Sequence, residues 1–184
     1  MTSTATGGFG TESGSIATFH SPAEEYVCTI FCFLSGVNFT LLYTSVAGFK
    51  FKQLFRNSEF KFYTTMIAAF TVFIMLELIF QCNYEVEHAF RSSVFQVVSF
   101  ITTTGLYSDD AAKWPHVTWV VLAACMFFGG SSGSTSGGIK SIRGVMLLKV
   151  VKNEFRQILH PNAVLPMKID GYNVQMSKRV TLLG

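Results

Sequence analysis

Two short stretches of the chain place hydroxyl groups and glycine in the same order. The first runs from Thr6 to Phe9 and the second from Thr103 to Leu106. Aligning them sets Gly8 against Gly105, an offset of 97 residues (105 minus 8). Backbone carbonyls and threonine hydroxyls can replace the water around a cation when several such strands face one axis. Because glycine takes left-handed conformations at little cost, the repeat predicts a cation-selectivity filter.

The candidate ion-binding residues are Thr6, Gly7, Gly8 and Phe9 in the first stretch and Thr103, Thr104, Gly105 and Leu106 in the second. Acidic residues follow both stretches, at Glu12, Asp109 and Asp110, and would attract cations to the outer mouth. One Thr-Thr-Gly sequence alone would more simply be a turn. The prediction therefore depends on the second copy, and two copies indicate a repeat architecture.

A run of glycine, serine and threonine extends from Gly129 to Gly138 between two apolar segments. Irregular backbone at membrane depth is tolerated only inside protein or beside a wet cavity, and broken helices recur at transport sites. The run is predicted to lie below the filter, where it could obstruct the pore and move to open it. The candidate gating residues are Gly129, Gly130, Ser131, Ser132, Gly133, Ser134, Thr135, Ser136, Gly137, Gly138 and Lys140.

Other interpretations of the polar residues stay open at this point. A phosphate-binding loop needs G-x-x-x-x-G-K-[ST], and Ile139 stands where that motif has lysine. An ordinary loop outside the membrane is the simpler alternative. Glu77 could bind an ion, but its place near the outer end of a predicted span favours interfacial water. The four histidines are scattered and predict no metal site.

The composition indicates a membrane protein. Of the 184 residues, 49% are hydrophobic and 14% are charged, whereas soluble domains carry about 25% charged residues. The run from Tyr26 to Gly48 has no charge and is predicted to span the bilayer, as is the segment from Phe62 to Phe80. The segment from Ala89 to Thr102 is too short to span and is predicted to be re-entrant. Val117 to Phe128 is also short, and helix is expected to resume from Ser141.

The basic residues orient these segments. Four lie in residues 50–61 and eight in residues 140–179, whereas residues 82–116 carry two against four acids. The positive-inside rule places the first two regions in the cytoplasm. Both filter-like stretches then lie towards the outside, which agrees with an even number of crossings between them.

Three groups of residues carry a resemblance to a known family. They are Thr102-Thr103-Thr104-Gly105 with Asp109 and Trp114-Pro115; the motif from Met126 to Lys140; and His160-Pro161-Asn162-Ala163-Val164 with Lys168. Together they resemble the Trk/Ktr/HKT potassium transporters and are most similar to the bacterial TrkH branch. The resemblance covers essentially the whole chain, and the long Gly/Ser/Thr motif is highly specific.

The resemblance implies an all-α integral membrane fold of four unequal helix–pore loop–helix repeats around one pore, like a K⁺ channel, with re-entrant pore helices and a broken inner helix. Residues 1–60 would hold the filter and inner helix of the second repeat, residues 61–156 the complete third repeat, and residues 157–184 a cytoplasmic connection. The chain would thus be a fragment without the first and fourth repeats, and a single copy could not close a fourfold pore.

The resemblance also implies potassium uptake across the bacterial inner membrane, with K⁺ as the transported ion and no bound cofactor. Its implied partners are membrane lipid, a second copy in a homodimer and a cytosolic nucleotide-binding regulatory subunit (TrkA-like), with no nucleic acid. The sequence departs from the family where Leu106 replaces a usual aromatic residue and Ser131 a frequent cysteine.

Three alternatives remain beside this interpretation. A Na⁺-permeable relative would have serine in place of a filter glycine, so Gly8 and Gly105 favour K⁺. A membrane-embedded enzyme would need polar groups converging at one depth, and the sequence places Glu77 and the histidines apart. A non-transporting membrane assembly subunit is the third. The prediction is therefore transport, not enzyme catalysis, with the coupling ion left open.

Overall fold

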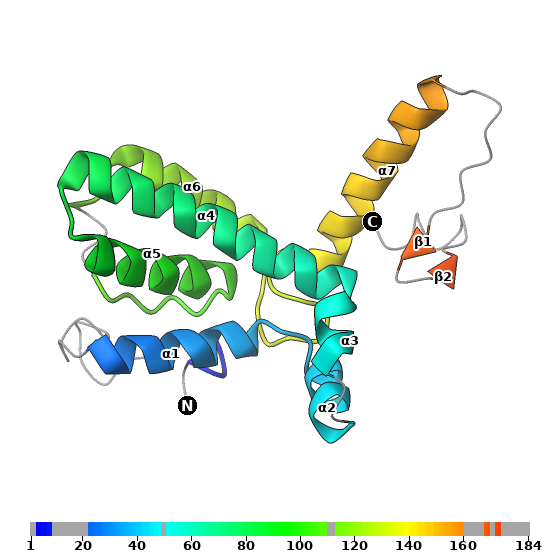
Figure 1. The fold of residues 1–184 in the computed structure, drawn as a ribbon, viewed down its shortest axis with the longest axis horizontal. Coiled ribbons are helices and arrows are strands. Elements are labelled where there is room, and N and C mark those ends of the chain that lie inside the picture. Colours follow the sequence, from blue (N-terminus) through cyan, green and yellow to red (C-terminus); the bar gives the residue numbers. More distant parts are fainter. Residues whose placement is uncertain are drawn as a thin grey trace.

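The computed structural model describes residues 3–8, 22–48, 51–109, 113–159, 168–169 and 172–173. Its elements are α1 (Pro22–Ser35), α2 (Phe39–Ala47), α3 (Phe51–Arg56), α4 (Ser58–Cys82), α5 (Val86–Ile101), α6 (His116–Phe127), α7 (Ser141–Leu159), β1 (Lys168–Ile169) and β2 (Tyr172–Asn173). Figure 1 shows this order along the chain. The predicted all-α architecture is confirmed, with one short antiparallel ribbon that pairs Lys168 with Asn173.

The helix α4 is the longest element and begins and ends at asparagine caps. The side chain of Asn57 accepts hydrogen bonds from the backbone of Glu59 and Phe60 at 2.9 and 3.1 Å, which starts the helix. Asn83 ends it in the left-handed conformation that asparagine tolerates. Among the described residues α4 alone is long and apolar enough to cross a membrane, or one of two spans if α1 and α2 count as one bent span.

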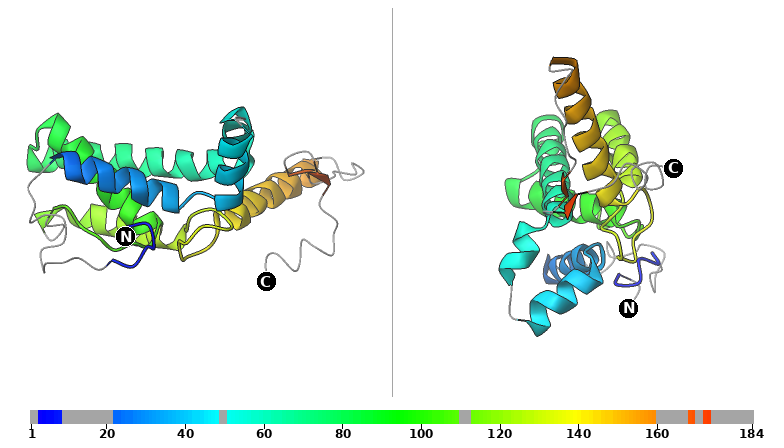
Figure 2. Two further views of the ribbon diagram at one scale, coloured as in Figure 1. Left: turned by 90° about the horizontal axis from the view of Figure 1, so that it is seen from below. Right: turned by 90° about the vertical axis from the view of Figure 1, so that its right-hand side faces the viewer.

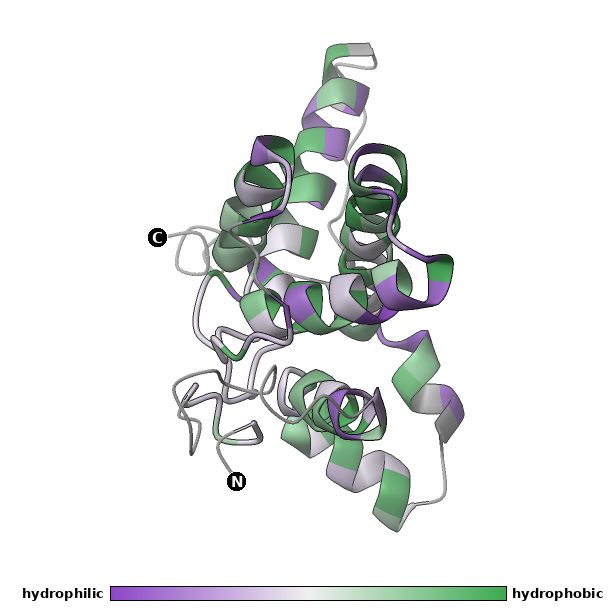
Figure 3. Ribbon diagram, turned by 90° about the vertical axis from the view of Figure 1, so that its left-hand side faces the viewer, coloured by the Kyte–Doolittle hydropathy of each residue, from purple (hydrophilic) through white to green (hydrophobic). Residues whose placement is uncertain are grey.

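The short helix α5 lies in the interior of the helical layers. It packs against α4, α1 and α6, and Figures 1 and 2 show α1, α5 and α4 running side by side. Phe95, Val97 and Val98 on α5 are at most 1% exposed, which holds this non-spanning segment at the centre of the core. Hydrophobic residues occur along the helices (Figure 3). Many of the large ones are exposed, as expected where apolar lipid is the solvent.

The run from Tyr26 to Gly48, predicted to span the bilayer, is not one continuous helix, because the chain bends by 101° between α1 and α2. Gly36 lies at the break, and a side chain there would overlap the Tyr63 hydroxyl on α4. The Tyr63 hydroxyl donates to the carbonyl of Phe33 at 3.1 Å. Asn38 caps α2 by accepting from the backbone of Thr40 and Leu41. An apolar run therefore contains a break that its composition does not reveal.

The predicted interruption between the last two helices is present. The Gly/Ser/Thr run separates α6 from α7, and the chain returns beside its own exit from α6. The Gly129 amide donates to the Ile139 carbonyl at 2.9 Å, and the Ile139 amide donates to the Phe127 carbonyl at 3.0 Å. Figure 1 shows this connection lying next to the break between α1 and α2.

Candidate functional site

The two filter-like stretches have positive φ angles at equivalent positions. Thr6 has φ +50° and Gly8 has φ +68°, while Thr103 has φ +54° and Gly105 has φ +77°. A β-branched residue with positive φ is rare, and here it occurs twice at the positions that the 97-residue offset aligns. Left-handed residues that alternate with ordinary ones turn successive peptide groups into similar orientations. This is the backbone geometry that can present a row of carbonyls to an ion.

The two stretches lie against each other. A side chain at Gly8 would overlap the carbonyl oxygen of Thr104, whereas a side chain at Gly105 would meet no atom within 4 Å. Gly8 is therefore required by both its conformation and its neighbour, and Gly105 by its conformation alone. Gly7 is exposed. The predicted residues Phe9, Glu12 and Asp110 lie outside the described residues.

Side chains of the second stretch alternate between the protein interior and the open side. Thr102, Thr104 and Leu106 are at most 3% exposed, while Gly105 and Tyr107 are exposed. The hydroxyls of Thr102 and Thr104 are 2.8 Å apart. This alternation fixes which side of the strand can face an ion path.

The end of α5 holds the same strand in place. The carbonyl of Ser99 accepts from the Thr104 amide at 2.8 Å, and its hydroxyl donates to the Leu106 carbonyl at 2.6 Å. The Leu106 carbonyl therefore points towards α5 and not towards an ion path. No hydrogen bond among the described residues is accepted by the carbonyls of Thr103 or Gly105.

The Gly/Ser/Thr loop contacts both stretches through their equivalent threonines. The Gly137 amide donates to the Thr103 hydroxyl at 2.8 Å. The Thr6 hydroxyl donates to the Thr135 carbonyl at 3.1 Å, and the Thr135 hydroxyl donates to the Thr4 carbonyl at 3.2 Å. The loop therefore reaches the one end of each stretch where a threonine hydroxyl could otherwise be an ion ligand.

Hydrogen bonds within the loop give it a fixed shape. The Ser136 hydroxyl accepts from the Gly130 amide at 2.9 Å and lies 2.8 Å from the Ser134 hydroxyl. The Lys140 ammonium donates to the carbonyl of Ser134 at 3.4 Å and also to that of Ser136. Lys140 thus places a positive charge directly on the loop backbone.

Other elements anchor the loop at positions that the sequence did not single out. The carbonyls of Ser35 and Gly36 accept from the loop amides of Thr135 and Ser131 at 3.3 and 2.8 Å. A side chain at Gly130 would approach the Gly36 carbonyl to 2.7 Å. The buried carboxylate of Glu59 accepts from the Ser132 amide. The pair Ser35-Gly36 inside an apolar run is the one sequence signal that could have indicated this contact.

Asp109 lies beyond the outer end of the second stretch, where several groups hold it. Its carboxylate accepts from the Tyr84 hydroxyl at 3.2 Å and from the Trp114 indole at 3.4 Å. Its backbone carbonyl accepts from the Gln96 side chain at 3.4 Å. Burial and the negative charge of Asp109 raise the pKa of Tyr84, so its hydroxyl keeps its proton.

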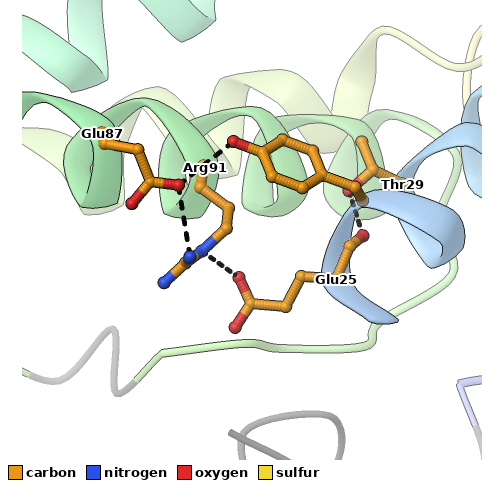
Figure 4. A network of polar contacts seen from close by, with 5 residues as sticks. Glu25, Thr29, Glu87 and Arg91 are labelled. Atoms are coloured by element: carbon orange, nitrogen blue, oxygen red, sulfur yellow. Dashed lines mark hydrogen bonds and ion pairs between the residues drawn. The ribbon is translucent and has the colours of Figure 1, made fainter. Parts of the chain in front are cut away.

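A charged network joins α1 to α5 (Figure 4). The Arg91 guanidinium forms ion pairs with Glu25 at 2.7 Å and with Glu87 at 3.3 Å. The Tyr26 hydroxyl donates to Glu87 at 3.3 Å. Arg91, the one charge in a predicted re-entrant segment, is therefore neutralised by the neighbouring helix and by its own.

The remaining polar candidates do not gather into a site. Glu77 is bonded to Gln81 one turn further along α4. Within residues 3–8, 22–48, 51–109 and 113–159, no three His, Cys, Asp or Glu side chains lie close enough together to hold a metal ion. The candidate functional site is therefore the region where the Gly/Ser/Thr loop contacts the two filter-like stretches.

Comparisons with known proteins match nearly the whole chain. The family model for the TrkH cation transport protein matches residues 1–181. The Trk system potassium uptake protein TrkH of Halomonas elongata is 34% identical over 170 residues, covering 92% of this chain and 35% of that protein. The Trk system potassium uptake protein TrkG of Escherichia coli is 37% identical over 165 residues, covering 90% and 34%. The chain thus spans about a third of the length of these relatives.

A solved structure agrees with the fold. The crystal structure of the potassium transporter TrkH from Vibrio parahaemolyticus superposes with a TM-score of 0.92 at 31% sequence identity, covering 99% of this chain and 39% of that one. The integral membrane fold and the location in the bacterial inner membrane, both expected from the sequence, are confirmed. The chain therefore belongs to the TrkH family of cation transport proteins.

Proposed function

We propose that this chain supplies two of the filter segments through which a membrane transporter takes up K⁺. The observation that carries the proposal is the shared backbone conformation of Thr6/Gly8 and Thr103/Gly105 in two stretches that touch. Carbonyls on such strands replace the water of a dehydrated cation. The proposed filter residues are Thr6, Gly7, Gly8 and Phe9 with Thr103, Thr104, Gly105 and Leu106. Leu106 has a buried side chain and a carbonyl that accepts from Ser99, so it holds the strand in place.

The pore helix supports cation binding at the filter. The helix α5 ends at Ile101, immediately before the second stretch. The carboxyl end of a helix carries partial negative charge, so α5 places that charge where a dehydrated cation would sit. K⁺ is the transported ion, for which the protein supplies the ligands and the electric field, and it moves down its gradient or by coupled transport.

The loop from Gly129 to Gly138 with Lys140 is the proposed gate. It lies on the threonine ends of both stretches through Thr103 and Thr6, and Lys140 adds a positive charge that opposes cation passage. Conduction requires this loop to leave the threonines. To do so, the loop would have to break the hydrogen bonds that Ser131 and Thr135 make at the break between α1 and α2.

The remaining assignments follow from the family and rest on the same proposal. Residues 1–60 form the filter and inner helix of one repeat, 61–156 a complete repeat, and 157–184 a cytoplasmic connection. A second copy, membrane lipid and a cytosolic nucleotide-binding regulatory subunit are the proposed partners. The relatives are named as components of a Trk system, which supports a multi-component assembly.

The test is rescue of growth in low K⁺. The full-length gene product that contains this chain is expressed in bacteria that lack K⁺ uptake, with its regulatory partner present. Gly105→Asp places a negative charge at a left-handed position of the filter. The control Asn83→Asp adds the same charge at an exposed helix cap that is predicted to lie on the same side of the membrane. We expect rescue by the parent and by Asn83→Asp, and none by Gly105→Asp. Failure of the well-expressed parent would overturn the proposal, and Na⁺ uptake by it would indicate the Na⁺-permeable alternative.

A further inference from the structure

The carboxylate of Asp109 lies at the outer end of the second stretch, where an acidic residue was expected to attract cations. Its hydrogen bonds instead fix its position. Two donors hold it, the Tyr84 hydroxyl at 3.2 Å and the Trp114 indole at 3.4 Å. A third bond, from the Gln96 side chain, holds its backbone carbonyl. These bonds fix both the side chain and the main chain of one residue.

The donors come from three separate segments around the filter. Tyr84 lies in the turn between α4 and α5, Gln96 lies on α5, and Trp114 follows the filter strand. Gln96 is fully buried and Trp114 is 3% exposed. The Tyr84 ring stacks on His88 of α5, with ring centroids 5.0 Å apart. Because each donor is held by its own packing, Asp109 is tied to a rigid frame.

The outer end of the second stretch depends on this frame. Its inner end is bonded to the loop through Thr103, and its middle is bonded to α5 through Ser99. Asp109 follows Leu106 by only three residues, so a displacement of Asp109 would reach the carbonyls of the strand. Selectivity between cations of similar charge depends on such carbonyl positions.

We propose that Asp109 is a positioning residue that sets selectivity for K⁺ over Na⁺ by holding the outer end of the filter strand through Tyr84 and Trp114. It does so instead of drawing cations to the mouth by its charge. The inference rests on the proposed function, because it concerns the selectivity of the same filter.

Positioning of the strand and attraction of cations by Asp109 can be distinguished by variants that keep the Asp109 side chain and remove its hydrogen-bond donors. Tyr84→Phe and Trp114→Phe each delete one hydrogen bond and leave the Asp109 side chain itself unchanged. Asp109→Asn removes the charge and keeps an oxygen that can accept. Matched controls are Tyr26→Phe, which deletes a phenol bond to Glu87 away from the filter, and Trp119→Phe at an exposed position of α6.

The measurement is K⁺ and Na⁺ uptake by the full-length gene product in cells over a range of concentrations. We expect each of the two Phe variants at Tyr84 and Trp114 to lower the K⁺ to Na⁺ uptake ratio by about fivefold, the effect of one lost hydrogen bond. The controls should keep the parental ratio. Tyr84→Phe removes a single hydroxyl from a half-buried side chain, so it carries the test if Trp114→Phe reduces the amount of protein in the membrane.

Each of the following results would contradict the inference. Parental ratios in both Phe variants, with a raised KM for K⁺ in Asp109→Asn, would make Asp109 an electrostatic attractor. Equal shifts in the control variants would indicate general packing and overturn it as well. A parent that transports no K⁺ would overturn the proposed function and the inference with it, whereas parental K⁺ uptake with unchanged ratios overturns the inference alone.

Discussion

The two filter-like stretches have positive φ angles at equivalent positions but different surroundings. Gly8 lies against the carbonyl of Thr104, whereas the corresponding position beside Gly105 is open. The second stretch is bonded to α5 through Ser99. Equal conformation thus does not mean equal tolerance of substitution. The first stretch is limited by a neighbouring strand, and the second by its own backbone.

Among the substitutions that test this difference between the two stretches, Gly8→Ala is expected to have the largest effect on K⁺ uptake. The added methyl group would overlap the Thr104 carbonyl, a backbone atom that cannot rotate away. It would also place a side chain at φ +68°, where non-glycine residues are strained. We expect loss of K⁺ uptake by the full-length protein, measured as uptake into K⁺-depleted cells. Uptake at the parental rate would mean that the two stretches are not in contact in the membrane.

Gly105→Ala should have a smaller effect, because it meets no neighbour within 4 Å. What remains is the strain of an alanine at φ +77°, about 1 to 2 kcal/mol. We expect K⁺ uptake to fall by about tenfold without being abolished, in the same assay as for Gly8→Ala. The comparison itself would be wrong if Gly105→Ala proved more damaging than Gly8→Ala in equal amounts of membrane protein.

The sequence predicted the parts of this arrangement that are local. The glycines and serines between Phe128 and Ile139 predicted a broken helix, and α6 and α7 end and begin as expected. The short apolar segment before Thr102 predicted a helix, which is α5. The repeat indicated left-handed positions at glycine. Their role as ion ligands stays a prediction.

The parts that were missed depend on contacts between distant segments. The break at Gly36 follows from Tyr63 on α4 and from the loop amide of Ser131, which lies 95 residues further along the chain. Glu59 appears in the sequence as one acid in a basic connection, yet its carboxylate is buried against the loop. Thr6 and Thr103 adopt positive φ although they are β-branched. Periodicity and composition carry no information about such partners.

The contact between the loop and the second stretch can be tested with Thr103→Val. Valine has a similar shape but removes the hydroxyl that accepts from the Gly137 amide at 2.8 Å. One lost hydrogen bond weakens an equilibrium by about fivefold, so the loop should open more often. We expect amide hydrogen exchange in residues 129–140 of the purified full-length protein to become about fivefold faster. Unchanged exchange would indicate that this bond does not hold the loop.

Thr6→Val tests the equivalent contact in the first stretch and should have the smallest effect. The Thr6 hydroxyl donates to the Thr135 carbonyl at 3.1 Å but also lies 2.8 Å from the carbonyl of Ala5, so its hydrogen is shared between two acceptors. The Thr135 backbone keeps a separate bond from its amide to Ser35. Removing the hydroxyl should therefore speed exchange of the same loop amides by only about twofold. An effect larger than that of Thr103→Val would mean that the first stretch, not the second, holds the loop closed.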